Sequence, residues 1–427
     1  MFIFTIQNSI KMTLKFKQLL FLLFFPTFIF AQVDEINPPS YIKTITFKGS
    51  TSQSQLPILR LGEPLLLEFD ALNGNEADFY YVIEHYNYDW TPSQLSKAEY
   101  LSGFDNQRIV NYENSFNAYQ IYSHYNLKIP NQQTRGFIKT GNYMVLIYDD
   151  YDELVFSRKF MIYEEAVNVG VTIKRSRDVK FINEKQSVDF IVSNNSFNFN
   201  NPSETVKALV IQNNNLNTAI SGLKPQYTLG NELIYRYDTE SSFWAGNEYL
   251  YFENKDVRAA NVGVQYTDLQ DIYHNYLFIN TERASRPYTY NPDINGNFLI
   301  TSLDADNVDI EADYTMIHFS LQYQPVIDGN KIYVYGNFNN YALNKENELL
   351  YNPENELYEC AFKLKQGFYN YKYVIVNKEG HLEEGAISGN FYQTENNYKV
   401  LIYYRDLGAR YDRLIGFGEG SSINISN

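Results

Sequence analysis

The chain is poor in the residues that hold a fold together through covalent bonds or metal ions. Its 427 residues include one cysteine, Cys360, and five histidines. A single cysteine excludes an intramolecular disulfide, so the core has to be held by packing. Cys360 lies in an alternating stretch and is interpreted as a small buried residue rather than a reactive thiol. No two histidines share the ligand spacing of a zinc site.

Positive charge and catalytic motifs are also scarce. The chain carries 35 Lys and Arg against 50 Asp and Glu, a formal net charge of −15, which disfavours nucleic acid as a partner. It has neither a Gly-x-Ser-x-Gly elbow nor a glycine loop for phosphate, so we expect no enzyme and no cofactor. The acidic stretch Asp304–Asp313 places Asp309 and Thr315 where a calcium loop needs Gly and Glu, so we expect a solvated turn and no bound metal.

No apolar run is long enough to cross a membrane. The longest, Leu19–Phe30, has twelve residues, whereas a spanning helix needs about 20. Three lysines precede it and Ala31 follows it, which is the pattern of a secretory signal peptide over residues 1–31, cut between Ala31 and Gln32. An uncleaved membrane anchor is the alternative. No cysteine stands at the cut, so we expect no lipid anchor and no membrane span.

Aromatic residues are abundant, with 39 Tyr and 30 Phe. Such residues suit the half-buried surface of a sheet, and short alternating runs such as Tyr80–Tyr86 recur between Asn, Asp, Gly and Pro turns. The pattern predicts an all-β fold of three consecutive immunoglobulin-like or early-set β-sandwiches. We expect these domains at residues 32–165, 166–313 and 314–408, followed by a flexible Gly- and Ser-rich tail at 409–427.

The third domain resembles the early-set module that binds glycogen. The resemblance rests on Lys331–Tyr341, which contains Gly-Asn-Phe-Asn-Asn-Tyr, and on Lys365–Tyr373, which reads Lys-Gln-Gly-Phe-Tyr-Asn-Tyr-Lys-Tyr. It implies a residual sugar site at Tyr341, Lys372 and Asn396. Tyr341 stands where the module has its first Trp, and no aromatic platform replaces the second. The fold is therefore expected without the module's usual ligand.

The whole stretch Gln32–Tyr404 resembles the type IX secretion system plug proteins of Bacteroidota. Matching segments include Tyr86–Ser93, Glu99–Phe104, Lys139–Tyr143, Phe243–Tyr249 and Glu311–Tyr314. The motif residues they contain are Trp90, Gly103, Phe104, Gly141, Asn142, Tyr143, Gly246, Asn247, Glu248, Tyr249, Glu311, Asp313 and Tyr314.

The resemblance implies a non-catalytic periplasmic protein that closes the periplasmic mouth of the giant SprA-type outer-membrane translocon barrel. It would lie at the periphery of the outer membrane. An envelope carbohydrate-binding protein that uses the C-terminal domain, and a structural or adhesive sandwich protein, are the alternatives. The long connection from Trp90 to Phe116 is one candidate for the sealing surface. The competing interpretation is that Trp90 and Phe104 pack back onto the first sandwich.

Overall fold

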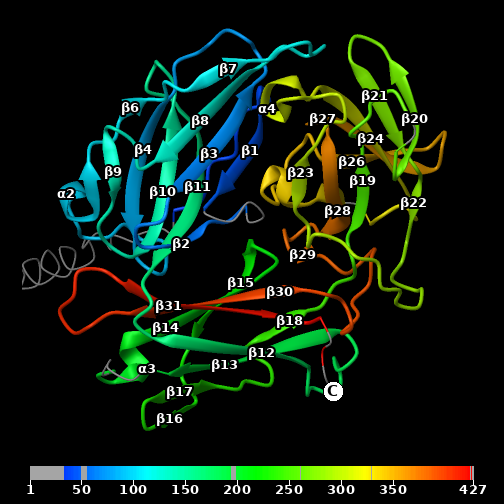
Figure 1. Cartoon of the computed structure of the whole chain (residues 1–427). Coiled ribbons are helices and arrows are strands. Elements are labelled where there is room, and N and C mark those ends of the chain that lie inside the picture. Colours follow the sequence, from blue (N-terminus) through cyan, green and yellow to red (C-terminus); the bar gives the residue numbers. More distant parts are fainter. Residues whose placement is uncertain are drawn as a thin grey trace, which may run out of the picture. The chain divides into compact units, whose positions relative to one another are not determined.

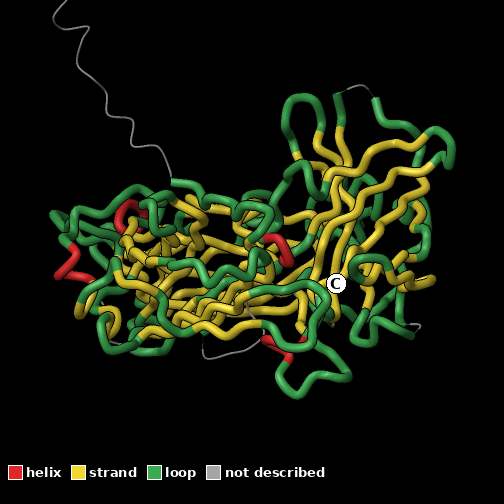
Figure 2. Tube along the Cα trace, turned by 90° about the horizontal axis from the view of Figure 1, so that it is seen from above, coloured by secondary structure: helices red, strands yellow, loops and turns green. Residues whose placement is uncertain are grey.

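The computed structural model describes residues 33–49, 55–193, 199–259, 261–327, 329–423 and 425. Strands make up 48% of the chain and helix 4%, which confirms a mostly β protein. Figure 2 shows the helices as a few short red segments among yellow strands. The predicted signal peptide and its cut at Ala31 and Gln32 lie outside the described residues.

The first group of strands forms two facing sheets and a short ribbon (Figure 1). One sheet has the order β1 (Ile42–Lys48), β3 (Leu65–Ala71), β8 (Ser123–Ile129), β7 (Tyr112–Asn114). The other has the order β2 (Ile58–Arg60), β11 (Leu154–Tyr163), β10 (Gly141–Tyr148), β4 (Tyr80–Tyr86), β6 (Gln107–Arg108). The ribbon pairs β5 (Leu101–Gly103), which follows α2 (Lys97–Tyr100), with β9 (Thr134–Phe137).

Alternation of side chains along these strands builds the first core. In β8, Tyr125, Leu127 and Ile129 are buried among core residues of both sheets. His124 lies on the opposite face, because successive side chains in a strand point to opposite sides. The outer face of this sheet is therefore polar, and the candidate site below is built on it.

The second group also has two sheets. One has the order β12 (Asn168–Arg175), β13 (Lys185–Ser193), β17 (Glu232–Tyr235), β16 (Tyr227–Leu229), and β18 (Ser242–Trp244) also pairs with β13. The other has the order β15 (Asn215–Leu223), β14 (Val206–Gln212), β30 (Asn397–Tyr404), β31 (Arg413–Ser421), and α3 (Pro202–Thr205) precedes β14. Asn213 and Asn214 form the tight turn between β14 and β15 with positive φ, as the Asn run predicts.

The third group is one curled sheet with several branches. Its order is β19 (Leu250–Glu253), β28 (Gly367–Val376), β25 (Lys331–Tyr335), β26 (Glu348–Asn352), β27 (Leu357–Lys365), β24 (Tyr314–Gln322), β21 (Tyr273–Leu277), β20 (Val264–Leu269). The branches are β22 (Asn280–Thr281) on β24, and β23 (Phe298–Ile300) and β29 (Leu382–Glu383) on β28. The helical pieces are α4 (Val308–Glu311) and the 3₁₀ turn η1 (Asn337–Asn339).

The strand pairing crosses the predicted domain boundaries. β19 and β23 precede residue 313 yet pair with β28, and β30 pairs with β14 of the second group. The tail also differs from the prediction, because residues 413–421 are not flexible but form β31 against β30. Strand-forming runs are local in sequence, whereas the choice of partner depends on long-range packing. The division into three immunoglobulin-like domains stays a prediction.

Candidate functional site

A buried polar cluster joins the outer face of the first sheet to the third group of strands. We name it the Asp70 cluster, after Asp70, His124, Tyr314 and Lys365. The Asp70 side chain is 0% exposed and that of Lys365 is 1% exposed. Lys365 Nζ lies 2.7 Å from Asp70 Oδ2, the Tyr314 hydroxyl donates to Oδ2 at 2.7 Å, and His124 Nδ1 lies 2.7 Å from Oδ1. The Asp70 carboxylate, on the first group of strands, is thus neutralised by Lys365 and hydrogen-bonded by Tyr314 from the third group.

The charge on Asp70 is stabilised by its partners. Burial acts to raise the pKa of Asp70, but the Lys365 ammonium and the His124 hydrogen bond outweigh it, so the pKa lies below its ordinary value. Lys365 also donates to the Asp309 carbonyl at 2.7 Å, and its Nζ lies 4.2 Å from the centre of the Tyr122 ring. The ammonium is therefore partnered on several sides, as a buried charge requires.

Of the motif residues, Tyr314 belongs to this cluster, and Asp313 and Glu311 lie beside it in the chain. The Asp313 carboxylate accepts hydrogen bonds from the backbone N–H groups of Tyr119 at 3.1 Å and Gln120 at 3.3 Å, which tie the β7–β8 loop to the third group. Glu311 accepts from the N–H groups of Asp306 and Asn307 and closes the loop of α4. Glu311, Asp313 and Tyr314 are thus brought together, and Asp313 and Tyr314 connect the third group of strands to the first.

We call a set of hydrogen bonds between two groups of strands a joint; the Asp70 cluster is the first. Gly141, Asn142 and Tyr143 lie at a second joint, between the first group and the sheet of β30. Asn142 Oδ1 accepts from the Tyr403 hydroxyl at 2.6 Å, and its Nδ2 donates to the Asn87 carbonyl at 3.0 Å. Gly141 has φ +139°, and a Cβ there would lie 2.7 Å from His85 Nε2. Tyr143 is buried and donates to the Lys139 carbonyl. These contacts explain why a glycine precedes the asparagine.

We expect His85, which lies beside this joint, to make the stability of the fold sensitive to acid. Burial lowers the pKa of His85 to about 4 and outweighs the Thr140 carbonyl, which faces Nε2 and acts to raise the pKa, while Nδ1 faces the Ser93 hydroxyl. The unfolded chain takes up this proton near pH 6.5, so the free energy of unfolding should fall by about 2 kcal/mol between pH 7 and pH 5. Urea unfolding at both pH values should show a smaller fall in His85→Gln, whose amide offers the same acceptor and donor. An equal fall in both proteins would contradict this role of His85.

The predicted segment Gly246–Tyr249 lies at a third joint, between the second and third groups. The Glu248 carboxylate accepts from the Tyr288 hydroxyl at 2.5 Å and from the Glu395 N–H at 3.1 Å. Asn247 donates to the Ser388 carbonyl, and Tyr249 N–H donates to Asp293. Burial raises the pKa of Glu248 and raises that of Asp293 to about 7. Gly246 has φ +65° and turns the chain into this joint.

Trp90 and Phe104 behave differently from one another. Trp90 is buried, and Lys159 Nζ lies 4.6 Å from the centre of its ring, so it packs back onto the first group. Phe104 is 73% exposed, while its backbone is fixed by the Gln133 carbonyl and the Thr134 hydroxyl. Gly103 before it has φ +91°, and a Cβ there would lie 2.0 Å from the Gln133 carbonyl oxygen.

Of the predicted sugar residues, Tyr341 offers no platform for a sugar. Its ring is 2% exposed and its hydroxyl donates to the Asn213 carbonyl at 3.0 Å. Asn396 is buried too. Its side-chain oxygen accepts a hydrogen bond from Asn213, and its Nδ2 donates to Gln186 Oε1 and to the Ala245 carbonyl. Lys372 is paired with Glu384. Lys372 and Asn396 nevertheless line one cavity of about 620 Å³, together with the exposed face of Trp244.

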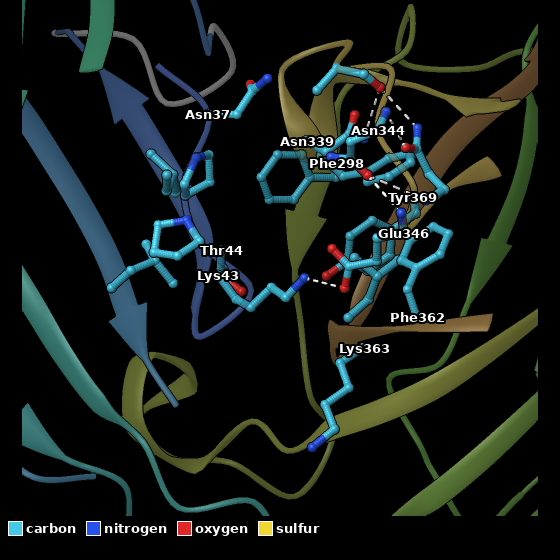
Figure 3. Close-up of a pocket in the computed structure, with 18 of the residues that line it drawn as sticks. Asn37, Lys43, Thr44, Phe298, Asn339, Asn344, Glu346, Phe362, Lys363 and Tyr369 are labelled. Atoms are coloured by element: carbon cyan, nitrogen blue, oxygen red, sulfur yellow. Dashed lines mark hydrogen bonds and ion pairs between the residues drawn. The ribbon is translucent and has the colours of Figure 1, made fainter. Parts of the chain in front are cut away.

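A smaller cavity, of about 70 Å³, lies between the first and third groups. Figure 3 shows Asn37, Lys43 and Thr44 on its one side and Phe298, Phe362 and Tyr369 on the other. Lys43 reaches across it and pairs with Glu346 at 2.5 Å. The cavity is too small for more than a few waters, so we interpret it as a packing gap that an ion pair closes.

Sequence reasoning missed Asp70, His124 and the role of Lys365. Asp70 lies in β3, whose other residues are mostly apolar, and a charged residue inside such a strand pattern signals a buried partner. The sequence does not identify that partner, which lies 295 residues further along the chain.

Two comparisons with known proteins show which family the chain is similar to. The family model for the first domain of the type 9 secretion system plug protein matches residues 42–164. A crystal structure of a hypothetical protein from Parabacteroides merdae shares 33% identity with the chain, at a TM-score of 0.87, and the match covers 92% of this chain and 100% of the other. The chain belongs to the type 9 secretion system plug protein family.

No curated protein matches the chain. Plug proteins are structural components of the secretion system, which agrees with a non-catalytic protein and links this family member to the translocon in the cell envelope. Among the described residues, no helix has the length and apolar character needed to cross a bilayer. The resemblance to the plug family is thus confirmed, with the family model matching residues 42–164.

Proposed function

We propose that the protein is a non-catalytic periplasmic plug that binds and seals the periplasmic opening of the type IX secretion outer-membrane translocon. Membership of the plug family is the observation that carries the proposal. The three joints support it, because buried hydrogen bonds and a buried ion pair fix the groups of strands against one another. A protein that closes a pore benefits from such rigidity, because movement between its groups of strands would open a path for solutes past the protein.

The β7–β8 loop is the contact surface that we propose. Phe116, Tyr119 and Ile121 lie in six residues of this loop and are 68%, 56% and 63% exposed. Apolar side chains gathered on one exposed segment are typical of a protein interface. The backbone of the loop is held from below by Asp313 and by the Ile310 carbonyl, which accepts from Phe116 N–H at 2.9 Å. The loop therefore presents these side chains in a defined position.

Affinity purification from detergent-solubilised outer membrane tests both proposals. A tagged copy should capture the translocon, and a Phe116→Ser, Tyr119→Ser, Ile121→Ser variant should capture at least ten-fold less, because apolar contact area is lost. The matched control changes Tyr227 and Leu229 to Ser, which are 65% and 68% exposed on β16. Failure of the unaltered protein to capture an abundant translocon would refute the plug function. Equal capture by the loop variant would refute the surface alone.

Sealing is separable from binding. Cells that lack the gene should admit large antibiotics or dyes across the outer membrane, because an open translocon would no longer be closed. Re-expression of the unaltered chain should restore the barrier. A strain without the gene that excludes these molecules as well as its parent would contradict sealing, whatever the affinity purification shows about binding.

Carbohydrate binding remains the second candidate because of the 620 Å³ cavity. Trp244 offers an exposed ring there, with Lys185 Nζ 4.3 Å from its centre, and the walls carry many amide side chains. Retardation on glycogen or starch affinity gels, abolished by Trp244→Ala, would favour this function. Migration unaffected by the polysaccharide would exclude it for those glycans.

A further inference from the structure

A further set of polar groups, which shares His124 with the Asp70 cluster, lies on the outer face of β3 and β8. Glu68 pairs with Asn126 across these strands and Asp70 pairs with His124, so Glu68 and His124 are diagonal neighbours on one face. Asp309, on α4, is placed against the same face. One ligand atom from each of Glu68, His124 and Asp309 lies within 4.8 Å of the other two.

His124 is the group that points to a ligand. Its Nδ1 is engaged by Asp70 Oδ1 at 2.7 Å. Its Nε2 is buried, and no hydrogen-bond partner for it exists among the residues that the structure describes. Nδ1 donates its hydrogen to the Asp70 carboxylate, and in the neutral ring this tautomer places the lone pair on Nε2. A histidine that donates one N–H to a carboxylate while its other nitrogen faces ligand oxygens has the arrangement found in metal sites.

The charges favour a cation at this position. Glu68, Asp70 and Asp309 bring three carboxylates together, against the ammonium groups of Lys365 and Lys48. Glu68 accepts from Thr46, Lys48 and Asn126, which use three of its four lone-pair positions and leave one for a metal. One imidazole and two carboxylates suit Zn²⁺ better than Ca²⁺, which prefers oxygen ligands alone.

We propose that Glu68, His124 and Asp309 bind one zinc ion that fastens the loop of α4 to the first group of strands. Ligands in a tetrahedral zinc shell lie about 3.4 Å apart, so small rotations of the exposed Asp309 and of Glu68 would complete the site. A fourth position stays open to water. The ion would add a link between two groups of strands that already share the Asp70 cluster.

Calorimetric titration of the chelator-treated, tag-free full chain with zinc chloride tests the site. We expect one ion per chain and at least ten-fold weaker binding in Asp309→Asn, whose exposed side chain has no role in the core. The matched control is Asp306→Asn, which removes the same charge from the same loop and should bind as the unaltered chain does. At one zinc concentration, the melting temperature should rise equally in the unaltered chain and in Asp306→Asn, and by less in Asp309→Asn.

A second measurement reports on the ligands directly. Cobalt(II) bound at the site should give the strong visible absorption of a tetrahedral ion, and His124→Gln should abolish it. Should His124→Gln fail to fold, the two aspartate variants decide the matter alone. Absence of zinc binding, or equal affinity in Asp309→Asn and Asp306→Asn, would overturn the proposal.

Discussion

Replacement of Lys365 by methionine is expected to lower the free energy of unfolding by about 3–5 kcal/mol. Methionine keeps the length of the side chain over the Tyr122 ring but removes the ammonium that lies 2.7 Å from Asp70. Asp70 would then remain fully buried with His124 and Tyr314 as its partners. An incompletely compensated charge in a dry interior is far more costly than a lost surface ion pair. Chemical denaturation at pH 7 measures the loss.

Lys331→Met is the matched control for this variant. Lys331 Nζ lies 2.9 Å from Glu348, a similar distance, but its side chain is half exposed to water. An ion pair at the surface contributes little because water screens it, so the same substitution should be nearly neutral. Equal losses in the two variants would show that the Asp70 cluster is no more important than a surface ion pair.

The pH dependence separates charge from packing in the Lys365 variant. In the unaltered chain the pKa of Asp70 lies below its ordinary value, so its stabilising effect is present above about pH 3.9 and is lost as the pH falls through the folded-state pKa. Without Lys365 the pKa of Asp70 should rise. The deficit of Lys365→Met should therefore be smaller at pH 4 than at pH 7. A deficit that does not change with pH would indicate lost packing instead.

Local patterns in the sequence predict many of the strands. The predicted run Tyr80–Tyr86 corresponds to β4. The turn between β10 and β11 is closed by Asp149, which accepts from the Tyr151 and Glu153 N–H groups at 2.9 Å. These features depend on residues close in sequence. The partners of β30, β19 and β23 do not, and so the sheets cross the predicted boundaries.

The C-terminal glycines show why one prediction is wrong. Gly416, Gly418 and Gly420 lie at alternate positions of β31, and a Cβ on each would lie 2.4–2.8 Å from residues of Ala166–Arg175. Glycine there permits close approach of β31 to β12, whereas the same composition is typical of flexible tails. Composition alone cannot distinguish the two, because the difference lies in the neighbouring strand.

The candidate site shows the same limit. Tyr314, Asp313 and Glu311 were identified through their resemblance to a family, and the structure gives them a physical role in a joint. Asp70 and His124 are equally central, yet they lie in ordinary strand patterns. Their importance comes from burial against α4 and Lys365, which only the folded chain reveals.

Gly103→Ala is the second change with a large expected effect, a loss of about 3 kcal/mol in the free energy of unfolding. The backbone at Gly103 has φ +91°, which a side chain rarely tolerates, and the new Cβ would lie 2.0 Å from the Gln133 carbonyl oxygen and 3.1 Å from Arg135 N. Both neighbours are backbone atoms, so no side chain can turn away to make room. The β5–β9 ribbon would have to separate, since Gly103 pairs with Thr134 there.

Gly62→Ala separates the two causes of this loss. Gly62 has a similar φ of +99°, but no atom of the residues that the structure describes lies within 4 Å of its added Cβ. It should lose only the conformational part, about 1 kcal/mol. Thermal and urea unfolding of the two variants side by side measure the difference, which is the contribution of the close approach. If Gly103→Ala were no worse than Gly62→Ala, the ribbon would be loose, and Phe104 would be displayed by a flexible segment. A difference of about 2 kcal/mol would show that β9 leaves no room for a side chain at position 103. Gly103 would then be part of a rigid support for the exposed Phe104 ring.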